Sequence, residues 1–226
     1  MPAPAVAGMA GPAEWEITEV VASPADLHRE LPGVDRRRVR VATATGPALV
    51  LGSTQDPSTV DRAALAARGA VLVQRRTGGG AVWVSPDDPL WIDIAVPADD
   101  PLHDDDVVRS FAWLGHCWLE ALTAVGLTAT IHQGPADRDP RARAVCFAGR
   151  GPGEVSVDGH KVVGLAQRRG RGGAVFQCAV NRSFDPLPLL EALGRTGDRR
   201  LADALPGRGT GVPHTRLLAA FLAALP

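Results

Sequence analysis

The 226-residue sequence has few cysteines, scattered histidines and no long apolar run. Its three cysteines are odd in number and widely spaced, which argues against a disulfide framework and against a zinc site. The six histidines lack the spacing of metal ligands, so a metal-dependent hydrolase has no support. No apolar run approaches ~18 residues and the N-terminus has no basic stretch. We therefore expect neither a membrane span nor a signal peptide, and a cytoplasmic location.

An excess of charge of either sign is also missing. The chain has 24 Lys and Arg against 25 Asp and Glu, a net charge of −1, so we expect no nucleic-acid partner and no anionic membrane surface. With 45% hydrophobic residues, a chain of this length can form one domain with a substantial core. We place that domain at residues 14–226, after an Ala-, Pro- and Gly-rich tail over residues 1–13 that we expect to be flexible.

Lysine is nearly absent: Lys161 is the only one, and the other 23 of the 24 basic residues are arginine. A general bias toward arginine is one explanation. The other is a task that a compact ammonium can perform and a planar guanidinium cannot. Lys161 lies in "EVSVDGHKVVG", where strand-like alternation on both sides of Asp158-Gly159 predicts a β-hairpin with a type I′ turn.

In this hairpin Lys161 would lie opposite Ser156, with Glu154 and Val163 on its face. The other face would carry Val155, Val157 and Val162. The pattern leaves open which of the two faces meets solvent.

The remaining pattern predicts more strands than helices. Strands are expected at 39–42 and 48–51, with two or three more within 70–84 and 89–97. Helices are expected at 57–69, 104–126 and 214–225, and residues 136–143 are polar and predict a loop. Because strands and helices do not alternate strictly, we predict an α/β (α+β) fold with a mixed, largely antiparallel sheet and packed helices.

The three consecutive glycines in "RRTGGGAVWV" need an explanation, because glycine costs backbone entropy and adds no packing. One explanation is a tight connection between strands around Leu72 and Val82. The other is close approach of the backbone to an anionic or narrow ligand, with Arg75 or Arg76 adding charge. A Walker loop is excluded, since no Gly-Lys-Ser/Thr follows.

Three stretches together resemble a known superfamily. "RRTGGGAVWV" resembles the Arg-Arg-x-Ser-Gly-Gly-Gly-Ala-Val signature of lipoate–protein ligases, and "VDGHKVVGLAQRR" resembles their Gly-x-Lys-x-x-Gly-x-Ala-Gln segment. "LVLGSTQ" resembles an upstream strand that ends in Asn/Ser-x-Gln. The chain thus resembles the biotin/lipoate protein ligase superfamily, closest to lipoate–protein ligase A-like and octanoyltransferase proteins.

The resemblance implies a class II synthetase-like catalytic domain and places the catalytic lysine of the family at Lys161. The substrate-binding positions that it implies include no metal ligand and are Gln55, Arg75, Arg76, Thr77, Gly78, Gly79, Gly80, Ala81, Val82, Gly164 and Ala166.

A ligase of this family joins lipoate or octanoate to ATP as an acyl-adenylate, with Mg²⁺ on the phosphates, and transfers the acyl group to a lysine of a carrier (lipoyl) domain. Biotin is a further acid within the superfamily. Val82 and Leu165 would line the acyl-chain tunnel.

The sequence departs from the ligase pattern at three places. Val84-Ser85 and Asp87-Asp88 stand where His-Asp and Gly-Asn are usual, and Gln177-Cys178-Ala179 stands where Gln-His-Gly is common. The chain also ends before the accessory C-terminal domain of the longer bacterial ligases.

Two alternatives therefore stay open. Octanoyltransferases of the superfamily need neither ATP nor another cofactor and take the acyl group from acyl carrier protein as a cysteine thioester. Cys146 in "AVCFAGRGPGEV" resembles that nucleophile, although free cysteines are usually small buried hydrophobes. Cys178 is a weaker candidate, and Cys117 is expected in the core. The second alternative is a non-catalytic acyl- or nucleotide-binding protein on the same scaffold.

Overall fold

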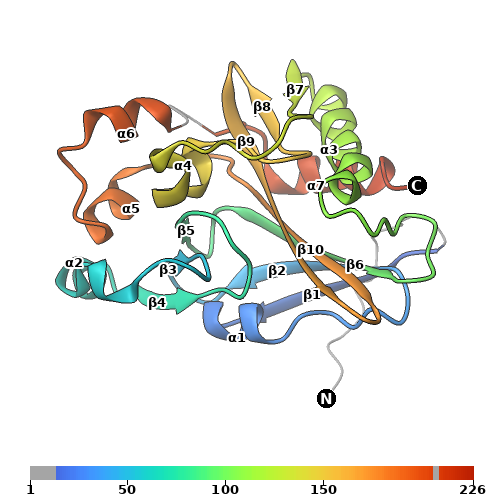
Figure 1. Cartoon of the computed structure of the whole chain (residues 1–226), viewed down its shortest axis with the longest axis horizontal. Coiled ribbons are helices and arrows are strands. Elements are labelled where there is room, and N and C mark those ends of the chain that lie inside the picture. Colours follow the sequence, from blue (N-terminus) through green and yellow to red (C-terminus); the bar gives the residue numbers. More distant parts are fainter. Residues whose placement is uncertain (1–13, 206–208) are drawn as a thin grey trace.

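The computed structural model describes residues 14–205 and 209–226, so the tail expected at residues 1–13 lies outside the described residues. A seven-stranded sheet forms its centre (Figure 1). The first two strands in its order run parallel and the other neighbours run antiparallel. The predicted mixed, largely antiparallel sheet is confirmed. Its order is β1 (Glu16–Ala22), β2 (Arg38–Ala44), β6 (Leu90–Pro97), β10 (Gly173–Val180), β9 (His160–Gly170), β8 (Val155–Val157) and β7 (Ala129–Ile131).

A second sheet has three strands, in the order β4 (Val71–Gln74), β3 (Ala48–Leu51) and β5 (Val82–Val84). The central strand β3 is parallel to β4 and antiparallel to β5. The strand predicted at 48–51 is β3, and the predicted strand at 39–42 lies within β2. These two neighbours in sequence thus belong to different sheets, a separation that local propensity does not encode.

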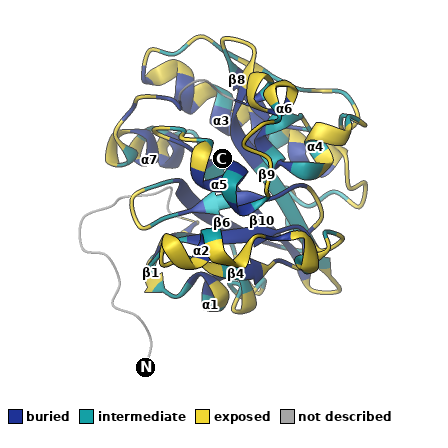
Figure 2. Ribbon diagram, turned by 90° about the vertical axis from the view of Figure 1, so that its left-hand side faces the viewer, coloured by how far each residue is buried: buried dark blue, intermediate teal, exposed yellow. Residues whose placement is uncertain are grey.

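Two hydrophobic clusters fill the molecule. The first lies between the large sheet and the helices α3 (Ala112–Ala124) and α7 (His214–Ala223), where the rings of Trp118 and Phe221 stack at 4.1 Å. The second joins the small sheet to four short helices and reaches the large sheet at Ala42, Ala44 and Trp91. Figure 2 shows buried residues along the strands and exposed residues on the outer faces of the helices. The four helices are α1 (Pro24–Arg29), α2 (Arg62–Ala67), α5 (Leu187–Ala192) and α6 (Arg199–Ala204).

The helices expected at 57–69 and 214–225 correspond to α2 and α7. Helix α2 is shorter than expected, because a 3₁₀ turn (Pro57–Thr59) precedes it and Asp61 caps its first turn by accepting from the Ala63 and Ala64 N–H groups. Gly69, predicted to end this helix, follows its last turn with a φ of +60°.

The prediction of one helix over 104–126 was wrong in its first part. Helix α3 begins at Ala112, after a 3₁₀ turn (Arg109–Phe111). Asp104 accepts from the Asp106 N–H, and Asp106 accepts from the Val108 and Arg109 N–H groups. These local side-chain bonds compete with helix formation, so the aspartates form turns ahead of the helix.

The predicted loop at 136–143 was also wrong in part, because helix α4 (Pro140–Ala144) begins inside it. Asp139 caps α4 by accepting from the Arg141 N–H, and Pro140 occupies the first helical position. Nowhere in residues 14–205 and 209–226 does a helix have the length and apolar character needed to span a bilayer.

Candidate active site

The glycine segment crosses over the end of β3. It connects β4 to β5, the strands that contain Leu72 and Val82, and passes β3, which lies between them in the sheet. The Ser53 N–H donates to the Thr77 carbonyl at 3.0 Å, and a Cβ built on Gly52 would lie 1.9 Å from the Gly79 carbonyl oxygen. A Cβ on Gly80 would lie 2.6 Å from the Val145 backbone. Glycine is therefore needed where this segment passes between β3 and the chain that leads to Cys146.

Cys146 is held by main-chain contacts to the glycine segment. It begins a 3₁₀ turn (Cys146–Ala148) directly after α4, and its N–H donates to the Ala81 carbonyl at 3.0 Å. The Ala81 N–H in turn donates to the Ala144 carbonyl at 3.0 Å, and the Gln55 side-chain amide donates to the same carbonyl at 3.0 Å. The glycine motif and the "LVLGSTQ" motif thus both donate a hydrogen bond to the carbonyl of Ala144, two residues before Cys146.

The predicted hairpin brings the lone lysine to the same place. Ser156 pairs with Lys161, and the turn residues Asp158 and Gly159 have φ values of +51° and +79°, as a type I′ turn requires. The Lys161 side chain is 3% exposed. Its Nζ donates to Glu154 Oε2 at 2.9 Å and to Cys146 Sγ at 3.5 Å. The sequence left open which face of the hairpin meets solvent. The Lys161 side chain is directed away from solvent, toward Cys146 and Glu154.

The lysine is held as a cation. Burial alone would lower the pKa of Lys161, but the charges of Cys146 and Glu154 outweigh that effect and raise its pKa above the ordinary value. The other two cysteines differ from Cys146, which is partly exposed. Burial raises the pKa of Cys117 to about 12 and raises that of Cys178 well above its ordinary value. Cys146 is therefore the best placed of the three thiols to react.

Cys146 lies where an apolar pocket meets an open polar cleft. Like Cys146, the residues Arg75, Leu165 and Ala166 line both the pocket and the cleft. The pocket continues along Val50, Val82, Val84, Phe147, Gly164 and Ala179. The cleft is lined by Gln55, Gly78, Gly79, Gly80, Glu154 and Lys161. An apolar wall on one side of Cys146 and charged side chains on the other form a lining suited to a ligand with an apolar tail and a polar head.

Buried polar groups stand at the pocket wall formed by β6 and β10. The Gln177 amide donates to Asp93 Oδ1 at 3.2 Å, and the Trp91 indole donates to the same oxygen at 3.0 Å. Asp93 also pairs with Arg40. The ring of His28 lies 4.5 Å from that of Trp91, and burial, with the charges of Arg75 and Arg40, lowers the pKa of His28 to about 3. The imidazole that lines this pocket is therefore neutral.

The two arginines of the glycine motif have different environments. Arg75 is buried, and its Nη2 donates to the carbonyls of Gly78 and Gly80 at 2.8 and 3.0 Å. Arg76 is exposed and lines none of the described pockets. Thr77 is buried, with no partner for its hydroxyl among the described residues. Of this motif, Arg75, the three glycines, Val82 and Val84 line the site, whereas Arg76 and Thr77 do not.

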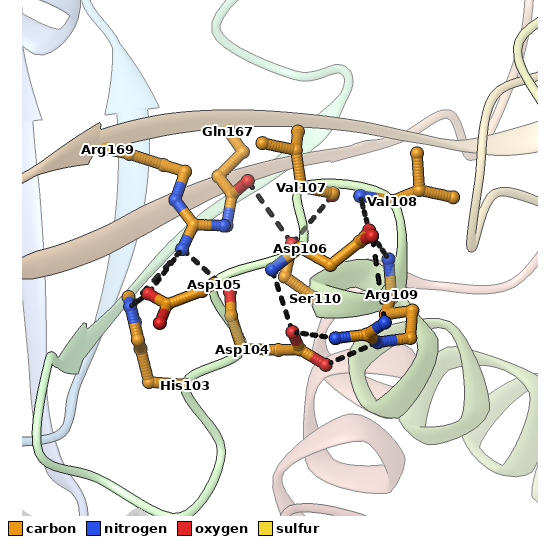
Figure 3. Close-up of polar contacts among 10 residues, drawn as sticks. All are labelled: His103, Asp104, Asp105, Asp106, Val107, Val108, Arg109, Ser110, Gln167 and Arg169. Atoms are coloured by element: carbon orange, nitrogen blue, oxygen red, sulfur yellow. Dashed lines mark hydrogen bonds and ion pairs between the residues drawn. The ribbon is translucent and has the colours of Figure 1, made fainter.

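Gln167, which ends the "GLAQ" stretch, was not among the predicted site residues and lines the cleft. Its Oε1 accepts from Ser110 Oγ at 3.3 Å, and its Nε2 is buried without a partner among the described residues (Figure 3). Two residues along β9, Arg169 donates to the Asp104 carbonyl at 2.6 Å. The loop of residues 103–110 thus anchors the end of β9 that follows Lys161, a contact without local sequence signal.

Two residues at which the sequence departs from the ligase pattern, Ser85 and Asp88, form hydrogen bonds within the protein. Asp88 accepts from the Arg182 and Ser183 N–H groups at 2.9 Å each and pairs with His214 at 3.2 Å. Ser85 donates from its N–H and its hydroxyl to the Asp88 carbonyl. Both residues therefore stabilise the connection between β5 and β6.

The family model of the lipoyl protein ligase A/B catalytic domain matches residues 19–206. The chain belongs to this family. It is 32% identical over 152 residues to "Octanoyltransferase LipM" of Moorella thermoacetica, a match covering 66% of this chain and 54% of that protein. The protein of the same name from Kyrpidia tusciae is 32% identical over 146 residues, covering 62% and 52%. The chain spans about half the length of these curated relatives.

Solved structures confirm the lipoate ligase fold of this family member. A bi-partite lipoate protein ligase from Thermoplasma acidophilum superposes with a TM-score of 0.68 at 18% identity, covering 90% of this chain and 79% of that one. A lipoate-protein ligase A bound with ATP superposes with a TM-score of 0.66 at 18% identity, covering 92% and 82%. At this identity the likeness concerns the fold alone.

Proposed function

We propose that the protein is an octanoyltransferase that carries a medium-chain acyl group on Cys146. The observation that supports this most directly is the contact between Lys161 Nζ and Cys146 Sγ, 3.5 Å apart, at the junction of the apolar pocket and the polar cleft. The apolar lining of the pocket suits an aliphatic chain, and a chain bound there would have its thioester carbonyl at the junction, within reach of both side chains. A nucleophilic thiol beside a fixed cation is the arrangement that acyl transfer through a thioester needs.

The reaction proceeds in two steps. The Cys146 thiolate attacks the carbonyl of an octanoyl thioester on acyl carrier protein, and the carbonyl electrons move to oxygen. They return to re-form the carbonyl, and the carrier thiolate leaves and takes up a proton. The amine of an acceptor lysine then attacks the acyl-Cys146 thioester, loses a proton and expels the Cys146 thiolate. The products are an octanoyl-lysine amide and free carrier thiol.

Lys161 has the same task in both steps. Each step places negative charge on the acyl oxygen and moves charge onto or away from the Cys146 sulfur. An ammonium beside that sulfur stabilises these charges, and its burial strengthens the interaction compared with water. The ammonium is compact enough to lie between the sulfur and the oxygen.

Similarity to proteins named octanoyltransferase supports transfer rather than ATP-dependent ligation. The ligase His-Asp and Gly-Asn positions are Val84-Ser85 and Asp87-Asp88 here, and Ser85 and Asp88 already have structural partners. We therefore assign no ATP or Mg²⁺ requirement to the reaction. A lipoyl domain is the proposed acceptor; the T. acidophilum ligase was studied with its E2 lipoyl domain.

A paired assay tests the proposal. Octanoyl–acyl carrier protein and a lipoyl domain, without ATP, should give octanoylated lipoyl domain. Octanoate or lipoate with ATP and Mg²⁺ should give no pyrophosphate exchange. The opposite pair of results would establish a ligase and overturn the proposal, and inactivity in both assays would indicate a binding protein.

A further inference from the structure

The Glu154 carboxylate accepts hydrogen bonds both from Lys161 and from the main chain. Its Oε2 accepts from Lys161 Nζ at 2.9 Å and from the Gly151 N–H at 2.6 Å, and its Oε1 accepts from the Leu165 N–H at 3.0 Å. The side chain is 6% exposed. Three donors, two from β9 and one from the turn at Gly151, therefore hold the carboxylate in one orientation, behind the lysine that faces Cys146.

A buried lysine beside a thiol can act in two ways. As a neutral amine it would remove the thiol proton; as an ammonium it would stabilise negative charge on sulfur and on the acyl oxygen. Burial without a partner favours the neutral amine, because desolvation disfavours the charged form. A carboxylate at 2.9 Å favours the ammonium.

The surroundings of Lys161 identify Glu154 as the group that decides between these roles. Within the described residues, Glu154 is the one carboxylate in contact with the ammonium, and Cys146 is the one thiol. Other charged or titratable groups line this cleft or the adjoining hollow that Lys161 also borders, but do not contact its ammonium. They are the basic residues Arg75, Arg138, Arg141, Arg143, Arg150 and His160 and the acids Asp137 and Asp139. Asp139 is paired with Arg141. Asp137 is already engaged with Arg150.

We propose that Glu154 is a positioning residue that fixes Lys161 as an ammonium directed at Cys146, so that the lysine acts as a permanent positive charge and not as the base that removes the thiol proton. The raised pKa of Lys161 agrees with this assignment. The inference rests on the proposed function for the reaction that it assists, but the charge of the lysine can be measured without any acyl substrate.

The single lysine makes this measurement direct. Protein grown with lysine ¹³C-labelled at Cε gives one lysine signal, whose chemical shift reports the protonation of Lys161. In the wild-type protein we expect a midpoint above the ordinary value of 10.5, because the pKa of Lys161 is raised. In Glu154→Gln we expect a lower midpoint than in the wild type, because no carboxylate then favours the charged form. Asp137→Asn, which alters an acid of the same cleft outside contact with the lysine, should titrate like the wild type.

A wild-type midpoint below the ordinary 10.5 would overturn the proposal, as would a Glu154→Gln midpoint equal to that of the wild type. If Glu154→Gln does not fold, the wild-type titration still decides the charge of the lysine, and Glu154→Asp decides its cause. Withdrawing the carboxylate by one methylene should lower the midpoint, and an unchanged titration of a folded Glu154→Asp protein would contradict the assignment.

Activity gives a second readout that a purely structural role would not produce. The alkaline limb of the pH profile of kcat/KM should move to lower pH in Glu154→Gln and keep its place in Asp137→Asn. A uniform loss of activity with an unchanged profile would assign Glu154 to stability alone. Because the lysine titration needs no acyl donor, failure of the transferase assay would leave that result intact.

Discussion

The side-chain amide of Gln55 donates to the carbonyls of Arg143 and Ala144, at 3.2 and 3.0 Å, and joins the segment after β3 to the chain just before Cys146. Its Oε1 accepts from the Gly52 N–H at 2.9 Å. Gln55 was expected among the substrate-binding positions. It lines the cleft, and its hydrogen bonds fix the chain that carries the thiol.

Gln55→Glu should therefore reduce both stability and Cys146 reactivity. The substitution keeps the size of the side chain but sets a carboxylate against two carbonyls. We expect the free energy of unfolding in urea to fall by about 1–3 kcal/mol, the usual cost of leaving buried polar groups unpaired. Alkylation of Cys146 by iodoacetamide should slow in parallel. Gln133→Glu, at an exposed position without hydrogen bonds among the described residues, should leave both quantities unchanged, and equal effects of the two substitutions would contradict this role.

Replacing the lysine by arginine tests why it is a lysine. Lys161 is enclosed by Glu154, Cys146 and Phe147, whose ring centroid is 5.3 Å from Nζ. A guanidinium is wider and spreads its charge, so we expect Lys161→Arg to lower kcat by roughly 10²-fold, the scale of losing one donor to a developing oxyanion. Arg76→Lys, an exposed exchange in the reverse direction, should retain activity. Turnover of Lys161→Arg within about threefold of the wild type would mean that the lone lysine reflects composition.

The glycine segment offers a matched pair of substitutions. A Cβ on Gly80 would meet the Val145 backbone at 2.6 Å, whereas a Cβ on Gly78 meets nothing within 4 Å and its φ is not positive. We expect Gly80→Ala to lower the free energy of unfolding by about 1–3 kcal/mol, as overpacking does. Gly78→Ala should stay within about 0.5 kcal/mol of the wild type. Thermal melts of both variants check this, and similar melting temperatures would show that the close approach is not required.

His28 should make stability depend on pH. Its pKa is about 3 in the folded protein against 6.5 unfolded. Between these values the unfolded chain binds a proton that the folded chain does not, so the contribution is present above pH 6.5 and lost as pH falls toward 3. Relative to wild type, His28→Gln should gain roughly 1–3 kcal/mol at pH 4.5 compared with pH 7.5. Urea unfolding at both values measures this gain, and an equal difference at the two pH values would contradict the buried neutral imidazole.

The parts of the site that the sequence predicts are those with a local signal. The hairpin register follows from Asp158-Gly159 and the alternation around it, so the position of Lys161 opposite Ser156 was predicted and is confirmed. Gly78–Gly80 and Lys161 line one cleft. The resemblance of both motifs to one superfamily had led us to expect both at the substrate site.

The parts that sequence reasoning missed depend on contacts between distant segments. The insertion of β3 between β4 and β5 has no signature in the residues of the glycine segment. Asp104 and Asp106 have the composition of a helix N-terminus and nevertheless form turns, because their side chains bind nearby N–H groups. The contribution of His28 to the pocket likewise requires α1 to pack beside Trp91.

The acyl-enzyme provides the most direct test of the account. The protein is mixed with octanoyl–acyl carrier protein without ATP, quenched in acid and analysed by intact mass and peptide mapping. We expect one octanoyl group on Cys146, none on Cys117 or Cys178, and its disappearance when a lipoyl domain is added before the quench. Cys146→Ser should show no thioester while remaining folded. Transfer to the lipoyl domain by a Cys146→Ala variant at the wild-type rate would contradict the central claim.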